Sequence, residues 1–253
     1  MSAAPIVVKL GGAQAHGPWL KGWLEALAAC AGRVVVVPGG GPFADTVRAQ
    51  QSLIGFDDEA AHDMAMLAMA QFGRALAGMR PGFDLVEEES ELRASLAQGR
   101  TPVWVPLRMA NAAGLAASWD TTSDSLAAWL AGRLGASRLI LVKHGEAASW
   151  RVLAAQGVVD NNFPAYLAAS GARACLAAPE RPDLLAAALE DKALPLIEWR
   201  GEAWLKPSVE SVQGVATPIV SAGPQGDAEA IVCLQGDPGT CADGLDLAAR
   251  ARL

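Results

Sequence analysis

Apolar residues follow two different periods along this chain. Residues 6–10 and Val34–Val37 are nearly unbroken apolar runs without the polar alternation of a half-exposed strand. Such runs are typical of strands that are covered on both faces. Between them the apolar positions recur at helical spacing, as at Leu20, Trp23 and Leu24. The chain therefore begins as strand, helix, strand.

The same alternation continues to about residue 199. Further strands are expected at residues 84–86, 101–107, 137–142, 172–178 and 194–199. Further helices are expected in the forties from Phe43, from Asp57 or Asp58 to about Leu76, near residues 88–98, over residues 118–135, at Phe163–Ser170 and at residues 182–191. Strands that alternate with helices predict an α/β fold, a three-layer αβα sandwich with a mainly parallel central sheet.

The pattern changes near residue 199. Short apolar runs separated by Gly and Pro follow, which indicates hairpins or a meander. We therefore expect a domain over residues 1–198 and a β-rich C-terminal extension over 199–253. The extension could form the far edge of the same sheet or a small appendage.

Composition narrows the possible functions. The chain has 253 residues, is 52% hydrophobic and carries a formal net charge of −7, so no basic field favours nucleic acid or anionic lipid. No apolar run reaches the roughly 18 residues of a membrane span, and no signal peptide is evident. Four cysteines without metal-like spacing favour reduced thiols and a cytoplasmic protein.

Three predicted strand ends carry unusual chemistry. They are the segments "KLGG" at 9–12, "PGGGP" at 38–42 and "KHG" at 143–145. Ligands of open α/β sheets bind beyond the carboxyl ends of the strands, and consecutive glycines let backbone N–H groups approach an anion. A lysine between two such loops would neutralise a group in transfer. The alternative is that the glycines make tight turns and the lysines only snorkel.

Two further segments could contribute to a site. Asp120 and Asp124 lie around a helix start, where an aspartate could hold a lysine or simply stabilise the helix. His62 lies among Asp57, Asp58 and Asp63, which could contact a cationic substrate, although a helical histidine is more often a packed residue. The histidines lack metal-ligand spacing, so the metal ligands are unknown.

Taken together, "VVKLGG", "VVVVPGGGP", "SWDTTSDSLAAWLA" and "LILVK" resemble the amino acid kinase superfamily, which includes aspartate, glutamate and uridylate kinases. Within it, "DEAAHDMAMLAMAQFG" and the "SWDTT" segment are similar to the [5-(aminomethyl)furan-3-yl]methyl phosphate kinases of methanofuran and methylofuran biosynthesis. The resemblance implies transfer of the ATP γ-phosphate to a phosphate monoester, with Mg²⁺ shielding the phosphates. It also implies a homo-oligomer.

The resemblance assigns roles residue by residue. Lys9, Asp124 and Lys143 would be catalytic, with Asp124 orienting Lys9. The nucleotide would be bound by Gly11, Gly12, Lys143, His144 and Gly145. The acceptor would be bound by Gly39, Gly40, Gly41, His62, Ser118, Trp119 and Asp120.

Two departures from the family pattern keep other functions open. Ala13 stands where the family usually has a serine, and "HGEAA" replaces the common Asp-Gly pair after the strand, so either Glu146 substitutes or the adenosine side is rebuilt. A kinase for another phosphate or carboxylate acceptor, or a catalytically weak nucleotide-binding regulatory subunit, would also fit these residues.

Overall fold

The structure is a computed structural model that describes residues 4–145 and 148–190 and the short strands at 197–200, 203–204, 219–222 and 228–231. The chain divides into two compact units, Met1–Ser208 and Val209–Leu253. In the second unit the described residues are β9 (Ile219–Ala222) and β10 (Ala228–Ile231), which pair antiparallel.

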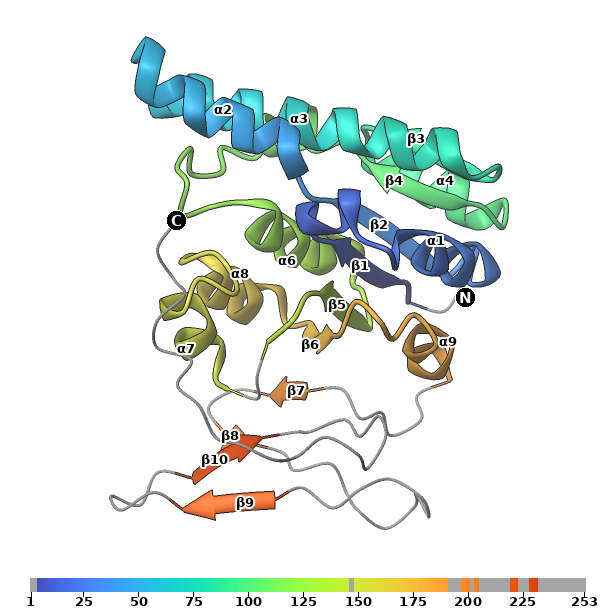
Figure 1. The fold of residues 1–253 in the computed structure, drawn as a ribbon. Helices are drawn as coiled ribbons and strands as arrows, with labels where there is room; N and C mark the ends of the chain where they lie inside the picture. Colours follow the sequence, from blue (N-terminus) through green and yellow to red (C-terminus); the bar gives the residue numbers. More distant parts are fainter. Residues whose placement is uncertain are drawn as a thin grey trace. The chain divides into compact units, whose positions relative to one another are not determined.

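The first unit is built on one eight-stranded sheet in the order β3-β4-β2-β1-β5-β6-β7-β8 (Figure 1). The first six strands in this order run parallel, whereas β7 and β8 are antiparallel to their neighbours. The parallel strands are β1 (Ile6–Leu10), β2 (Val34–Pro38), β3 (Phe83–Val86), β4 (Thr101–Trp104), β5 (Arg138–Val142) and β6 (Arg173–Ala177). The antiparallel edge consists of β7 (Ile197–Arg200) and β8 (Ala203–Trp204).

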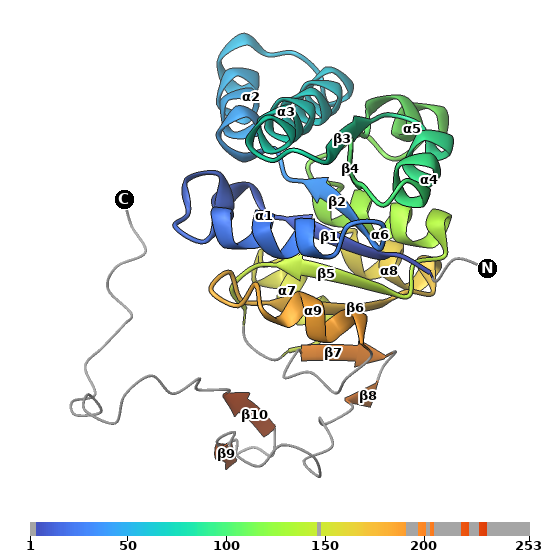
Figure 2. The same cartoon turned by 90° about the vertical axis from the view of Figure 1, so that its right-hand side faces the viewer.

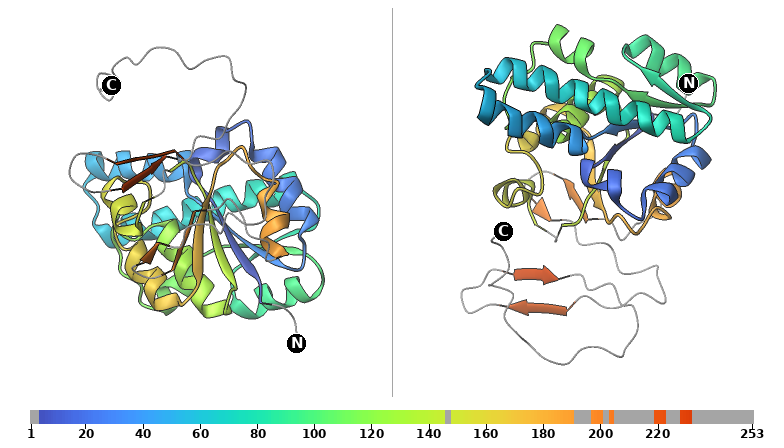
Figure 3. Two further views of the ribbon diagram at one scale, coloured as in Figure 1. Left: turned by 90° about the horizontal axis from the view of Figure 1, so that it is seen from below. Right: turned by 45° about the horizontal axis from the view of Figure 1, so that its top comes forward.

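Successive residues of the central strands enter two separate apolar layers. Val7 packs in one core cluster, whereas Ile6 and Val8 pack in the other, because side chains alternate between the faces of a strand. One layer lies beneath α6 and α8, and the other beneath α1 and α9, on opposite sides of the sheet (Figures 2 and 3). This arrangement confirms the predicted three-layer α/β fold.

The predicted helices occur in the predicted order, whereas α5 and α7 were not predicted, and α2 and α3 pack side by side as a pair (Figure 1). Within the described residues, no helix is long and apolar enough to cross a membrane. The helices are α1 (Leu20–Ala29), α2 (Gly41–Ile54), α3 (Asp58–Met79), α4 (Glu89–Ala97), α5 (Leu107–Ala112), α6 (Ser123–Leu134), α7 (Trp150–Ala155), α8 (Phe163–Ser170) and α9 (Leu184–Leu189), and a 3-10 turn η1 covers Gly12–His16.

Local signals explain where these helices begin and end. Asp57 caps α3 by accepting a hydrogen bond from the backbone N–H of Ala60 at 2.8 Å. Gly135 ends α6 in the left-handed conformation, at φ 59°. The segment 118–122 is not helical, so α6 begins later than residue 118, the first residue of the predicted helix.

The predicted domain boundary falls within the strands at the sheet edge. β8 belongs to the predicted extension, yet it pairs with β7 in the main sheet. Most of residues 199–253 lie outside the described residues, so the extension as a whole stays a prediction.

Candidate functional site

Three of the predicted segments meet at one edge of the sheet because β1 lies between β2 and β5. Leu10 is in register with Pro38 on one side and with Val142 on the other. The residues that follow these strands, Gly11, Gly39 and Lys143, therefore emerge together at the carboxyl edge.

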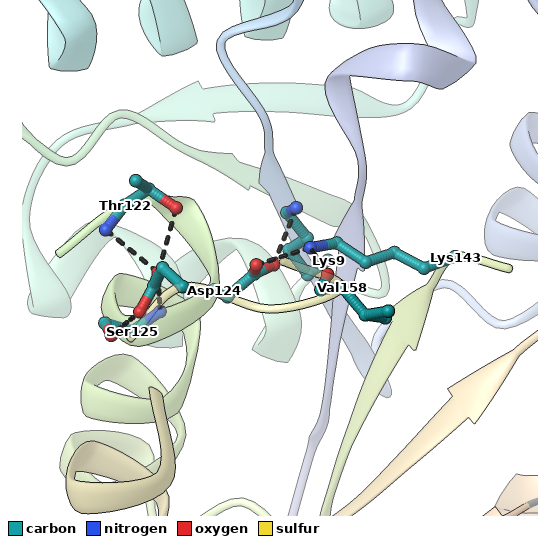
Figure 4. A network of polar contacts seen from close by, with 7 residues as sticks. Lys9, Thr122, Asp124, Ser125, Lys143 and Val158 are labelled. Atoms are coloured by element: carbon teal, nitrogen blue, oxygen red, sulfur yellow. Dashed lines mark hydrogen bonds and ion pairs between the residues drawn. The ribbon is translucent and has the colours of Figure 1, made fainter. Parts of the chain in front are cut away.

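A buried carboxylate joins the two lysines (Figure 4). Lys9 Nζ lies 2.7 Å from Asp124 Oδ1, and Lys143 Nζ donates to Asp124 Oδ2. Lys143 Nζ also donates to the carbonyl oxygen of Val158 at 2.6 Å. Lys9 and Asp124 are only 3% and 2% exposed, whereas the Lys143 side chain is 20% exposed. The cluster of Lys9, Asp124 and Lys143 carries a net charge of +1 when both lysines are protonated.

Burial and like charge shift the pKa values in this cluster. Desolvation lowers the pKa of Lys9 from its ordinary 10.5 to about 8, with Lys143 adding to the shift and Asp124 opposing it. Burial alone would raise the pKa of Asp124, but the two ammonium groups outweigh burial and lower it. A phosphate anion would offset the excess positive charge, so the cluster is suited to bind one.

The two glycine bends lie against each other. The N–H of Gly39 donates to the carbonyl of Leu10 at 2.8 Å. A Cβ on Gly12 would lie 2.3 Å from the backbone nitrogen of Gly41, and a Cβ on Gly39 would lie 2.5 Å from that of Gly12. Gly41 also has φ +56° at the first residue of α2. Glycine is therefore required for the close contact between the bends.

A cavity of about 390 Å³ opens beside the bends. Its walls come from the bends, from α2 and α3, and from the segment 118–123. Of the predicted site residues, it is lined by Gly12, Gly40, Gly41, His62, Ser118 and Trp119. Gly39 and Asp120 do not line it.

His62 is the buried titratable group of this cavity wall. It is 8% exposed, and its Nε2 has no hydrogen-bond partner within the described residues. Burial lowers its pKa, and Asp63 opposes that shift. The imidazole is therefore neutral near pH 7, and its buried Nε2 is left without a hydrogen bond from the described residues.

Side chains of α2 hold Trp119 in place at the cavity wall. Its indole N–H donates to Gln51 Oε1 at 2.7 Å, and the guanidinium carbon of Arg48 lies 4.2 Å from the centre of its ring. Gln51 also donates to Asp58 Oδ1 at 2.8 Å. Arg48 and Asp58 line the cavity as well. These contacts connect α2, the start of α3 and the 118–123 segment.

The remaining predicted nucleotide ligands lie outside this cavity. The His144 side chain is 75% exposed, with Nδ1 3.9 Å from Glu180 Oε2. A Cβ on Gly145 would lie 2.8 Å from Leu176 Cδ1, so this glycine allows close packing on β6. Glu146, one of the two alternatives for the missing Asp-Gly pair, lies outside the described residues.

The fold brings to the site several polar residues that no sequence motif marks. Arg48 and Asp45 follow the glycine bend on α2 and line the cavity. Asp160 accepts hydrogen bonds from Thr122 and Ser125 at the start of α6. The run "VVDNNFP" before α8 contains typical capping residues, but nothing in it points to a helix 35 residues earlier.

Comparison with known proteins decides the family. The family model described as "Amino acid kinase family" matches residues 4–146, which span β1 to the end of β5 and both glycine bends. The chain belongs to the amino acid kinase family. The predicted resemblance to this superfamily is confirmed.

Individual relatives are more distant. The chain is 25% identical over 140 residues to a [5-(aminomethyl)furan-3-yl]methyl phosphate kinase from Methanocaldococcus jannaschii. That match covers 53% of this chain and 63% of the relative, which is less than two thirds of its length.

Solved structures of two uridylate kinases share the fold. Uridylate kinase from Archaeoglobus fulgidus matches with a TM-score of 0.57 at 16% identity, over 74% of this chain and 96% of that one. UMP kinase from Ureaplasma parvum matches with a TM-score of 0.56 at 17% identity, over 75% and 96%. At these identities the likeness concerns the fold alone.

Proposed function

We propose that this chain is an ATP-dependent phosphotransferase that moves the γ-phosphate to a small phosphate monoester and releases a diphosphate and ADP. The acceptor we propose is [5-(aminomethyl)furan-3-yl]methyl phosphate, in methylofuran or methanofuran biosynthesis. The observation that carries the proposal is the buried Lys9–Asp124–Lys143 cluster beside two touching glycine bends.

The proposed reaction needs positioning and charge neutralisation more than covalent chemistry. An oxygen of the acceptor phosphate attacks the γ-phosphorus, the bond to the bridging oxygen breaks, and ADP takes that oxygen with its electrons. Lys9 lies against the transferred group, and Asp124 holds both ammonium groups in place before the substrate arrives. Such preorganised charges require little rearrangement in the transition state.

The cavity supplies suitable chemistry for the acceptor. Its glycine end fits a phosphate, since the backbone N–H groups at the start of α2 carry the positive end of the helix dipole. Asp58 and Asp45 line the same cavity and suit an ammonium group. Asp57, which caps α3, and Asp63, which accepts from Asn111 at 3.2 Å, do not line the cavity. We therefore assign the amine contact to Asp58, with Asp45 on the lining of the same cavity.

The nucleotide would bind from the Lys143 side. Gly11 lies beside both lysines, since a Cβ there would lie 3.9 Å from Lys9 Nζ and from Lys143 Cγ, and 3.2 Å from the carbonyl oxygen of Val142. Bound Mg²⁺ would neutralise part of the phosphate charge. The described residues contain no cluster of three or more metal-binding side chains, so the phosphates and water would supply most of its ligands.

The test is ADP release with Mg-ATP and a panel of acceptors. The panel contains the amine-bearing furan phosphate, UMP, aspartate and glutamate. Lys9→Ala should abolish acceptor-dependent release, whereas Lys21→Ala, at an exposed lysine on α1, should not change it. If ADP is released only with UMP, or only with a carboxylate, then that compound is the acceptor instead. ATP binding without acceptor-dependent release would replace this function with that of a regulatory nucleotide-binding protein.

A further inference from the structure

The loop between α7 and α8 contacts three separate parts of the proposed site. At residue 158 its backbone binds Lys143, at residue 160 its side chain binds the start of α6, and at residues 161 and 162 it binds the segment beside the cavity. Neither the sequence motifs nor the family match, which ends at residue 146, assigns a role to this loop.

Asp160 replaces the missing cap of α6. Thr122 is the N-cap residue, but its side chain makes no capping bond within its own helix. Instead, Asp160 Oδ2 accepts from the backbone N–H of Thr122 at 2.9 Å and of Ser125 at 3.0 Å. The Thr122 hydroxyl donates to the same oxygen at 2.8 Å, and the Ser125 hydroxyl donates to Oδ1. These bonds satisfy N–H groups that a helix start otherwise leaves unpaired.

This cap fixes the direction of the catalytic carboxylate. Asp124 lies between Thr122 and Ser125 in the chain, so the four bonds from these two residues to Asp160 hold the chain on both sides of it. Its carboxylate then reaches the two lysines at the end of β1 and β5. A change in the cap would move Asp124 relative to both ammonium groups.

The next two residues of the loop hold the wall of the cavity. Asn161 Nδ2 donates to Asp120 Oδ1 at 2.7 Å, and Asn162 Nδ2 donates to Thr121 Oγ1 at 2.9 Å. The backbone N–H of Asn162 donates to the carbonyl of Asp120 at 2.9 Å. Thr121 and its neighbour Trp119 line the cavity, so the asparagines position the acceptor side.

The loop itself is anchored in the core. Val159 and Phe163 flank the polar residues and are 2% and 0% exposed. Phe163 packs edge-on to Trp150 with 4.9 Å between the ring centres. The polar side chains therefore extend from a fixed base.

We propose that residues 158–162 set the spacing between the lysine cluster and the acceptor wall, with Asp160 as a positioning residue for the phosphoryl transfer. The proposal rests on the proposed function for its kinetic part only. Its structural part concerns the environment of Lys9, which can be measured without turnover. The negative charge of Asp160 also raises the pKa of Lys9.

The experiment compares Asp160→Asn, Asp160→Glu and wild type. Asp160→Asn should lower kcat about 10–100-fold, since small misplacements at a reacting centre have effects of this size. Nuclear magnetic resonance of labelled lysines reports the second readout, because the chain has five lysines and Lys9→Arg assigns the Lys9 signal. In Asp160→Asn, Lys9 should titrate at lower pH. Asp160→Glu restores the charge, so Lys9 should titrate nearer to its wild-type pH.

Two further variants make the result decisive. Asp183→Asn removes an exposed carboxylate, paired with Arg181, from a different loop and should leave both readouts unchanged. Asn161→Ala removes one exposed bond and should raise the acceptor KM about threefold or more without moving the Lys9 titration, which serves if Asp160→Asn does not fold. An unchanged kcat and Lys9 titration in Asp160→Asn, or an unchanged KM in Asn161→Ala, would overturn the proposal. No turnover in wild type would refute the proposed function, while the Lys9 titration would still test the loop.

Discussion

At the scale of single residues, the pKa values of Lys9 and Asp124 are both lowered within one buried cluster. Two ammonium groups share one carboxylate in a buried place, so one positive charge has no partner within the cluster. Desolvation makes that charge unfavourable on Lys9, which is more buried than Lys143. A ligand phosphate supplies the missing negative charge.

This imbalance predicts the pH dependence of catalysis. The pKa of Lys9 is lowered to about 8, so kcat/KM for Mg-ATP should be level below that pH. Above it, kcat/KM should fall about tenfold per pH unit as Lys9 loses its proton. Initial rates between pH 6.5 and 9.5 measure the limb. Lys9→Arg keeps its charge throughout this range, so an alkaline limb at the same pH in that variant would contradict the assignment.

A second residue prediction concerns the amine of the acceptor. Asp58→Asn should raise the KM for an amine-bearing acceptor about tenfold or more, since a charge-assisted hydrogen bond contributes about 1.5–3 kcal/mol. The KM for an acceptor without an amine should stay the same. Asp63→Asn, on the same helix but outside the cavity lining, is the matched control. Equal effects of the two substitutions would remove the amine contact from Asp58.

At the scale of elements, the two glycine bends act as one unit because each occupies the space that a side chain on the other would need. Gly12→Ala places a Cβ 2.3 Å from the Gly41 nitrogen and must push the bends apart. It should lower the free energy of unfolding by about 1–3 kcal/mol and abolish acceptor-dependent ADP release. Urea denaturation and the ADP assay measure the two effects.

Gly78→Ala provides the control for this prediction. Gly78 lies in α3, and a Cβ there would meet nothing within 4 Å. The substitution should leave activity unchanged and stabilise the protein by up to about 1 kcal/mol, because alanine favours a helix over glycine. Similar losses in both variants would show that the bends have no special packing.

The elements also show what sequence could and could not predict. Strands and helices followed from local periodicity, and the joint position of Lys9, Gly39 and Lys143 followed from parallel strands ending at one edge. Asp160 was missed because its four bonds reach residues 35 and 38 positions earlier, which no local pattern records. Arg48 was missed because its role in the cavity depends on how α2 packs beside Trp119.

At the scale of the whole molecule, a net charge of −7 coexists with a buried site of opposite sign. The surface charge therefore says little about the ligand. The excess positive charge of the cluster must instead be accounted for in the folding equilibrium, because its burial is unfavourable in the free protein and favourable once an anion binds.

Folding stability should consequently rise with pH in one window. Lys9 binds its proton up to about pH 8 in the folded chain and up to its ordinary 10.5 in the unfolded chain. Between these values the unfolded chain binds more protons, so raising the pH favours the folded state, by about 3 kcal/mol over the full window. Lys9→Met removes this contribution. Urea denaturation of both proteins from pH 7.5 to 10.5 should therefore give curves that diverge, and parallel curves would mean that Lys9 carries no buried charge. Saturating pyrophosphate should flatten the wild-type rise, because a bound anion restores the pKa of Lys9 and couples ligand binding to the stability of the entire first unit.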